Sequence, residues 1–342
     1  MIKSGKDTIF ASKLIKEGKL VAFPTETVYG LGANGLDAKA VARIFEAKKR
    51  PSFDPLILHI SSIDELPTVF KKPISPLIIR LAEKYWPGPL TIVAPKTGKV
   101  PAIVSAGLKT VAVRMPSHKV ALKLIKQAGV PIAAPSANIF GRLSPTEPIH
   151  VKEQLKTIDY LLDGGKTEIG LESTIVTVSG STIEILRPGA ITPDRIRADF
   201  PDAKVIMSDT DKHIKAPGQL KSHYSPRKPL YLFDEVPEKL PDYAGLLLFE
   251  PHHVPDNAQS KIILLSPEGD LLEAAARMFA ALHELEADPS VEQIFAVKVK
   301  EEGIGLAIMD RMNKAAYRFT HFVDEQGIEE NEENSVLYTD SK

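Results

Sequence analysis

Hydrophobic and polar positions follow two periods along this chain, which predicts a mixture of helices and strands. Helices are predicted where apolar residues recur every three to four positions, at 7–17, 37–50, 75–85, 119–128, a short segment after 148, and 271–286. Strands are predicted for short apolar runs at 20–23, 56–60, 90–94, 111–114, 131–134, 160–162, 173–178, 182–186, 230–233, 245–249, 262–265 and 294–299. Asp37 is the expected N-cap of the second helix, and Pro76 opens the third.

The order of these elements predicts two domains. Strands mixed with helices, including a hairpin turned at Ser179–Gly180, predict an α/β or α+β domain with a twisted mixed sheet over residues 1–207. Residues 208–228 are polar and aperiodic, which indicates a linker. Alternating strands and helices over 229–330 predict a smaller, Rossmann-like open α/β domain with a parallel sheet. Residues 331–342 form an acidic tail.

One stretch, VAFPTETVYGLGANG at 21–35, combines a short strand with hydroxyl, acidic and glycine residues. We interpret it as a strand that runs into a site-forming loop, with the glycines returning the backbone. Gly30, Gly32 and Gly35 fit the G-x-G-x-x-G spacing of a nicotinamide dehydrogenase. Such a motif has its first glycine directly at the end of the strand, whereas here the six residues 25–30 follow Pro24 before the turn can begin. The working part is therefore predicted to be 24–27, a hydrogen-bonding shelf for a small polar ligand.

Composition narrows the chemistry. With 342 residues, 43% of them hydrophobic, the chain can bury a full core, and the absence of cysteine excludes disulfides and a thiol nucleophile. No secretion signal or membrane-length apolar run is present, so a cytoplasmic protein is expected. Residues 1–207 carry 29 Lys and Arg against 19 Asp and Glu, whereas 208–342 carry 14 against 25. The basic half suits an anionic substrate, or an RNA-binding module without catalysis.

Several side chains at predicted element ends could form a site. Lys48 and Arg50 end a helix, where cations are often merely solvated, and Arg114 and Arg187 end strands beside prolines. Together they would place four cations around one cleft, which suits a triphosphate. His59 taken alone is more often a satisfied strand-end histidine than a ligand. The serines and asparagine at 136, 138, 144 and 173 could equally form turns.

Ten motifs in one order resemble one family, the threonylcarbamoyl-adenylate synthases in their long form with a YrdC-like catalytic domain. The motifs are FPTETVYGLGAN (23–34), IFEAKKRP (44–51), PLILHI (55–60), WPGPLT (86–91), VAVRMP (111–116), PIAAPSAN (131–138), ESTIV (172–176), LRPG (186–189), APGQLKSHYSP (216–226) and GIGLAIMDRMNKAA (303–316). The resemblance covers nearly the whole chain.

This resemblance implies a nucleotidyltransferase that makes L-threonylcarbamoyl-AMP from ATP, L-threonine and bicarbonate or CO2, for threonylcarbamoyladenosine modification of tRNA. It implies Mg2+ with ATP, metal ligands unknown, and tRNA and downstream threonylcarbamoyl-transfer proteins as candidate partners. Threonine would be held by Thr25, Thr27, His59, Arg114, Ser136 and Ser173. The nucleotide would be held by the catalytic Lys48 and Arg50 with Asp54, Thr110, Asn138, Ser144, Arg187, His223 and Tyr224.

Three features depart from the family pattern. Asp54 stands where the family usually has asparagine, which puts one nucleotide contact in doubt. Ile139–Phe140–Gly141 and Leu143 replace the commoner residues around Ser144. The linker segment 216–226 is expected to cross the cleft as a lid that excludes water from a labile carbamate.

Overall fold

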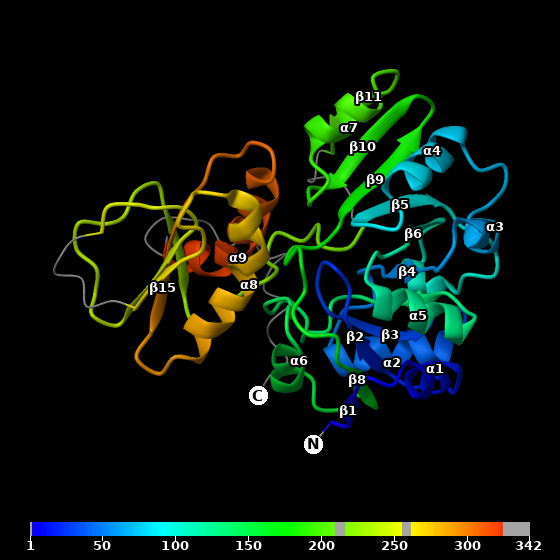
Figure 1. The fold of residues 1–342 in the computed structure, drawn as a ribbon, viewed down its shortest axis with the longest axis horizontal. Helices are drawn as coiled ribbons and strands as arrows, with labels where there is room; N and C mark the ends of the chain where they lie inside the picture. Colours follow the sequence, from blue (N-terminus) through cyan, green and yellow to red (C-terminus); the bar gives the residue numbers. More distant parts are fainter. Residues whose placement is uncertain (1, 209–215, 255–260, 324–342) are drawn as a thin grey trace.

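The computed structural model describes residues 2–208, 216–254 and 261–323, and Figure 1 shows two α/β units joined by the linker. The first unit runs from blue to green and the second from yellow-green to red. The acidic tail predicted at 331–342 and part of the linker lie outside the described residues. No described residue belongs to a helix that is both long and apolar enough to cross a membrane. The predicted domain boundaries stay a prediction.

The first unit is built on a mixed sheet, as predicted. Its strands are β1 (Ser4–Gly5), β2 (Val21–Phe23), β3 (Gly30–Asn34), β4 (Ile57–His59), β5 (Leu90–Pro95), β6 (Thr110–Arg114), β7 (Ile132–Ala133), β8 (Tyr160–Leu162), β9 (Thr174–Ser179), β10 (Thr182–Arg187) and β11 (Lys204–Met207). They are ordered β1-β8-β2-β3-β7-β4-β6-β5-β9-β10-β11. The carboxyl ends of the parallel pair β4 and β6 lie side by side, so His59 is in register with Arg114.

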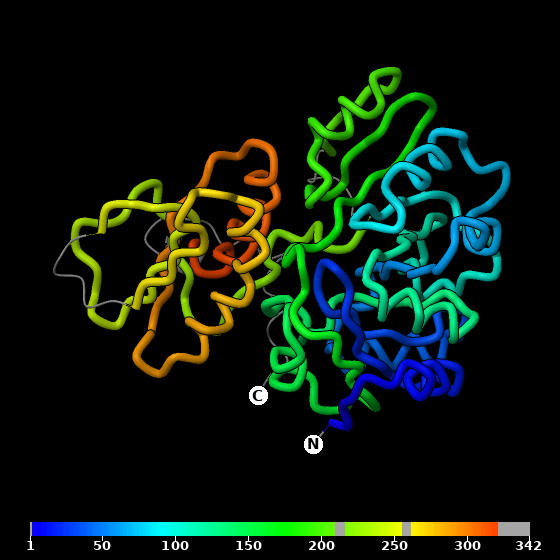
Figure 2. The backbone as a smooth tube through the Cα atoms, viewed as in Figure 1, coloured from blue at the N-terminus to red at the C-terminus, as the bar shows by residue number. Residues whose placement is uncertain are grey.

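Helices cover this sheet (Figure 2), and all but those at 66–69 and 193–199 lie where the apolar spacing predicts them. They are α1 (Thr8–Lys16), α2 (Ala38–Lys48), α3 (Leu66–Val69), α4 (Pro76–Tyr85), α5 (Lys119–Ala128), α6 (Pro148–Gln154) and α7 (Pro193–Asp199), with short 3-10 turns at Ile63–Glu65 and Ala102–Ser105. The N-cap prediction at Asp37 is confirmed, because its carboxylate accepts hydrogen bonds from the N–H groups of Lys39 and Ala40.

The prediction of a loop over 24–35 is wrong for its second half, because Gly30–Asn34 forms strand β3, antiparallel to β2. The glycines are required by packing. A Cβ on Gly32 would lie 2.7 Å from Phe23 Cε1 and 2.8 Å from Ile132 Cγ2. Glycine is usually a strand breaker, but here it allows neighbouring side chains to close over the strand. Gly30 and Gly32 therefore lie within the sheet and form no dinucleotide turn.

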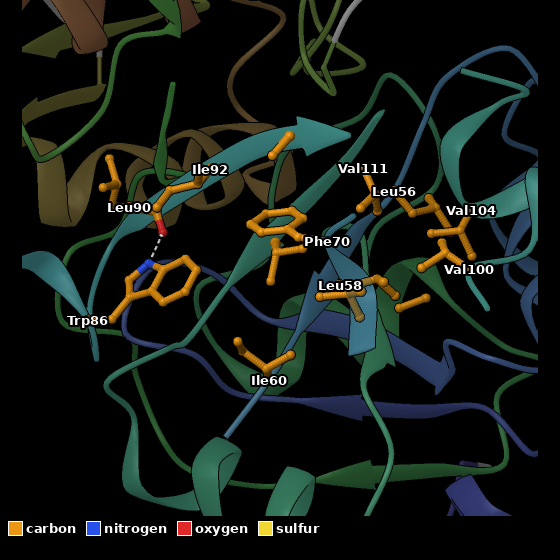
Figure 3. Close-up of a cluster of buried hydrophobic side chains, with 14 of the residues drawn as sticks. Leu56, Leu58, Ile60, Phe70, Trp86, Leu90, Ile92, Val100, Val104 and Val111 are labelled. Atoms are coloured by element: carbon orange, nitrogen blue, oxygen red, sulfur yellow. Dashed lines mark hydrogen bonds between the residues drawn. The ribbon is translucent and has the colours of Figure 1, made fainter. Parts of the chain in front are cut away.

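Apolar side chains from the sheet and from α2 and α4 form the main core. Figure 3 shows part of this core around Leu58, Ile60 and Phe70, all fully or almost fully buried. The indole N–H of Trp86 donates a hydrogen bond to the carbonyl oxygen of Leu90 at 2.6 Å, which satisfies the buried polar atom of that ring. The core thus fixes the strand ends from which the site residues project.

The second unit is a four-stranded parallel sheet, as predicted. Its strands β12 (Leu230–Phe233), β13 (Ala244–Leu248), β14 (Lys261–Leu264) and β15 (Gln293–Val297) are ordered β12-β15-β13-β14. Helices α8 (Leu271–Ala287) and α9 (Gly305–Val323) accompany it. Its apolar core also contains Leu143 and Leu171 of the first unit, packed with Tyr224 of the linker and Phe279 of α8. The two units therefore share a buried apolar contact.

We expect Gly32→Ala to lower the free energy of unfolding by about 1–3 kcal/mol, because the added methyl group must displace Phe23 or Ile132. Urea unfolding followed by circular dichroism measures the change. Gly98→Ala is the matched control, since a Cβ there meets no atom within 4 Å. Equal unfolding midpoints for the two variants would contradict the packing role of Gly32.

Candidate active site

Ten of the predicted site residues line one small cavity of about 50 Å³ at the strand ends of the first unit. They are Thr25, Thr27, Arg50, His59, Arg114, Ser136, Ser173, Arg187, His223 and Tyr224. A larger cavity of about 500 Å³ lies between α6 and α8, and none of the predicted site residues lines it. We assign the site to the smaller cavity, because the convergent charged and hydroxyl side chains are there.

The shelf at 24–27 is a hydroxyl-stabilised turn. Thr25 Oγ1 donates to the carbonyl oxygen of Val28 at 2.6 Å and accepts from the N–H groups of Thr27 and Val28. The Thr27 hydroxyl lies 2.8 Å from that of Thr25. Thr25 is thus largely occupied with its own turn, which leaves Thr27 directed at the rest of the site.

Arg114 is buried and held from three sides. Its Nη1 donates to Thr27 Oγ1 at 2.8 Å, its Nη2 lies 2.6 Å from Glu26 Oε1, and its Nε donates to the Gly88 carbonyl at 3.2 Å. Burial opposes ionisation of Glu26, but the charge and hydrogen bond of Arg114 outweigh it and lower the pKa of Glu26. Glu26 belongs to the shelf predicted at 24–27, but the sequence did not predict it as a ligand-binding residue. It fixes Arg114 before any ligand binds.

His59 is a neutral imidazole at physiological pH. Burial and the nearby Arg114 lower its pKa to about 3. The ring stands edge-on to Phe23, with 6.0 Å between centroids, and its Nδ1 is buried without a hydrogen-bond partner among the described residues. The neutral ring lines the cavity, where it can contact a polar ligand.

The alternative of a solvated helix end is wrong for Lys48 and Arg50, which are 1% and 7% exposed. Lys48 Nζ donates to the carbonyl oxygens of Ser136, at 2.6 Å, and Asn138. It does not line the cavity but holds the loop at 136–138 that does. Burial lowers the pKa of Lys48 well below its usual value.

Arg50 lines the cavity and forms an ion pair with Asp54, which does not line it. Arg50 Nη2 lies 2.9 Å from Asp54 Oδ1 and donates to the Pro55 carbonyl at 2.8 Å. Burial raises the pKa of Asp54, while Arg50, Lys48 and Arg187 oppose that shift. Asp54 is absent from the cavity lining. The departure from the family pattern at this position therefore supplies a counter-ion.

Arg187 contacts both Ser173, which is predicted to bind the substrate threonine, and the linker. Its Nε and Nη2 donate to the Ser173 carbonyl at 3.2 and 3.0 Å, and its Nη1 donates to Pro217 of the linker at 3.3 Å. The Ser173 hydroxyl also lies 2.7 Å from that of Thr91. Arg187 thus connects a wall of the cavity to the linker.

The linker closes the cavity with aromatic rings. Burial and surrounding cations, chiefly Arg50 and Lys48, lower the pKa of His223 well below its usual value, so its ring is neutral. Its ring contacts Phe140 at 5.6 Å and Tyr224 at 4.1 Å between centroids. Tyr224 has a positive φ of 62°. Phe140, one of the residues that depart from the family pattern, therefore packs against the linker through His223.

Five predicted nucleotide residues lie outside the cavity lining: Lys48, Asp54, Thr110, Asn138 and Ser144. Thr110 begins β6, roughly 13 Å along the strand from Arg114. The Asn138 amide donates to the carbonyls of Ile139 and Arg142, at 2.8 and 2.9 Å. The Ser144 hydroxyl donates to Glu172. Lys48, Asn138 and Ser144 thus hold loops, a role that sequence spacing cannot distinguish from ligand contacts.

Glu172 is the charged residue of the lining that the sequence did not predict as a site residue. It lies directly before Ser173 in the ESTIV motif, but a carboxylate is unexpected in a pocket for anions. Within 2–208, 216–254 and 261–323, no group of three or more His, Asp or Glu side chains is placed to hold a metal ion.

The buried neutral histidines predict lower stability in acid. His59 and His283, with folded pKa values of about 3 and 4, bind protons less readily than the unfolded chain, whose histidines titrate near 6.5. Stability is therefore complete above pH 6.5 and falls as the pH drops towards 4, by up to about 2 kcal/mol per histidine at pH 5.

Urea unfolding at pH 7.5, 6 and 5 measures this dependence. His283→Gln should flatten it, whereas the exposed His253→Gln should leave it unchanged. The same pH slope in wild type and His283→Gln would contradict the assignment.

Comparison with known proteins gives one consistent result. Residues 13–189 match the Sua5/YciO/YrdC family model, described as telomere recombination, and residues 184–317 match the model for the C-terminal domain of threonylcarbamoyl-AMP synthase. The chain is 42% identical to threonylcarbamoyl-AMP synthase of Pyrococcus abyssi, over 90% of this chain and 93% of that one. The Bacillus subtilis enzyme of that name is 39% identical, over 90% and 92%.

The fold agrees. A crystal structure of P. abyssi Sua5 complexed with L-threonine superposes with a TM-score of 0.81 at 37% identity, covering 93% of this chain and 98% of that one. Together with the cavity that gathers ten of the predicted residues, these likenesses show that the chain belongs to the threonylcarbamoyl-AMP synthase family of enzymes.

Proposed function

We propose that this protein makes L-threonylcarbamoyl-AMP from L-threonine, bicarbonate or CO2, and ATP, releasing pyrophosphate. The observation that carries the proposal is the gathering of three buried arginines, Arg50, Arg114 and Arg187, around one hydroxyl-lined cavity. Such a set suits two anionic substrates, a carboxylate and a polyphosphate. The names of the relatives and the threonine complex of P. abyssi Sua5 support the same reaction.

The chemistry needs no nucleophile from the protein. The threonine amine adds to CO2, forming an N–C bond and losing a proton, and bicarbonate can supply CO2 by taking up a proton and losing water. A carbamate oxygen then attacks the α-phosphorus of ATP, and the bond to the β-phosphate oxygen breaks to release pyrophosphate. The protein has to hold both substrates in line and balance the charge that develops on the phosphates.

On the threonine side, Arg114 is proposed to bind the carboxylate. Glu26, Thr27 and Gly88 fix its guanidinium in advance, so little conformational entropy is lost on binding. His59, Ser136 and Ser173 line the same cavity and complete this wall. The threonine hydroxyl and amine would bind to these groups.

On the nucleotide side, Arg50 and Arg187 are proposed to bind the phosphates, with His223 and Tyr224 covering the nucleotide. Lys48, predicted to be catalytic, would act by holding the loop at 136–138. Mg2+ would arrive with ATP, since phosphate oxygens usually supply much of its coordination. Direct contact with tRNA or transfer proteins, and a cytoplasmic location, stay predictions.

The cavity of about 50 Å³ is far smaller than the several hundred Å³ that a nucleotide-sized ligand needs. Pro217, Gly218, His223 and Tyr224 of the linker close it. Substrate entry therefore requires these residues to move. The lid predicted from the sequence stays a prediction.

The reaction is tested by incubating the protein with MgATP, L-threonine and bicarbonate and measuring pyrophosphate. We expect release only when all three substrates are present. Salt-dependent tRNA binding without threonine-dependent release would instead support the RNA-binding alternative, since phosphate contacts weaken with salt.

Arg114→Ala should raise the KM for threonine by about 10–100-fold, the loss of one charge-assisted contact, and change the KM for ATP much less. Because this change leaves Glu26 buried without a partner, the assay is repeated in a Glu26→Gln background. Arg43→Ala is the control, since Arg43 is half exposed and pairs with Asp159. Equal increases in both KM values would refute the carboxylate role of Arg114.

A further inference from the structure

The motif at 303–316 in helix α9 has no role in the reaction proposed above. Arg311 in this motif is fully buried, and it extends from the second unit into the first. Its Nε donates to Glu172 Oε2 at 3.0 Å, its Nη1 to the Pro188 carbonyl at 2.8 Å, and its Nη2 to the Glu172 carbonyl at 3.3 Å. Arg311 of the second unit thus binds both the carboxylate and the backbone carbonyl of Glu172.

Glu172 lines the cavity, and its second carboxylate oxygen, Oε1, accepts the hydroxyl hydrogen of Ser144. Glu172 is only 6% exposed, so its charge requires a partner inside the protein. Arg311 supplies the ion pair. Without it, a buried carboxylate would face the place where the phosphates of ATP are proposed to bind, and it would repel them.

The same helix also fixes the linker. Lys314 Nζ donates to the Gly218 carbonyl at 2.7 Å, and the Lys314 carbonyl accepts the N–H of His223 at 3.2 Å. The Arg311 guanidinium carbon lies 5.6 Å from the centre of the Tyr224 ring. Asp310 pairs with both Arg311 and Lys314, at 2.7 Å in each case. One turn of α9 therefore contacts the cavity wall and its cover.

Docking of the two units does not by itself require these charges. The apolar contact of Leu143 and Leu171 with Phe279 and Tyr224 already joins them. A buried ion pair contributes little net stability compared with apolar packing, although removing one partner is costly. The position of Arg311 is therefore better explained by what it does to Glu172.

We propose that Arg311 is a positioning residue through which the second unit completes the nucleotide side of the site. It neutralises Glu172, and it fixes that carboxylate so that Ser144, whose hydroxyl donates to it, keeps its place. The inference rests on the proposed function for the identity of the nucleotide. It assigns the second unit a part in ATP binding that acts through Glu172.

Isothermal titration calorimetry of MgATP and, separately, of L-threonine tests the proposal on the full chain. Arg311→Met should weaken ATP binding by about tenfold or more and threonine binding by less than about threefold. Arg311→Lys should recover part of the ATP affinity, because the charge remains. Adding Glu172→Gln to Arg311→Met should recover most of it, because no unpaired carboxylate is left. Arg318→Met on the same helix is the control, since Arg318 is far along α9 and contacts Phe319.

Equal weakening of both ligands, or no recovery on adding Glu172→Gln, would overturn the proposal and leave Arg311 a docking residue. If Arg311→Met does not fold, the comparison of Arg311→Lys with the double variant decides in the same way. Calorimetry does not depend on turnover. Wild-type protein that binds ATP but releases no pyrophosphate would therefore refute the proposed reaction and leave the role of Arg311 to be judged by the variants.

Discussion

Buried charge is the constraint on which this site depends. A site for two anions needs cations, and cations inside a protein need partners, because an unpaired buried ion is strongly unfavourable. Arg114 is paired with Glu26, Arg50 with Asp54, and Arg311 with Glu172, while Arg187 and Lys48 donate to backbone carbonyls. The paired cations keep a fixed geometry, and the acids that hold them set the orientation of each guanidinium.

This pairing explains why residues far apart in the sequence have to meet. Glu26 follows β2, whereas Arg114 ends β6, and the pair forms because the sheet order brings β2, β3, β7, β4 and β6 into one surface. The tight packing at Gly32 allows that order, since β3 lies between β2 and β7. The stability of the sheet and the placement of the substrate groups therefore have a common origin.

The two units act on one cavity. Leu143 and Leu171 are buried in the apolar core of the second unit, and α9 reaches the cavity through Arg311 and Lys314. The linker lies between them and contributes His223 and Tyr224. A domain whose sequence composition is acidic thus contributes a cation, Arg311, that pairs with Glu172, a buried acid of the basic domain.

The sequence by itself determined most elements, the two-domain α/β character and the family, because apolar periodicity and short motifs are local properties of the chain. It also identified ten of the residues that line the cavity. The tertiary structure decided the rest. Glycine spacing indicated a loop where β3 is a strand, since what makes glycine necessary there is Phe23 on another strand.

The same limit applies to Lys48, Asn138, Ser144 and Glu172. Whether a polar side chain faces a ligand or holds a loop depends on which distant group satisfies it, and only the folded chain brings those groups together. The partner of Glu172 is 139 residues away at Arg311, so no local pattern could reveal it.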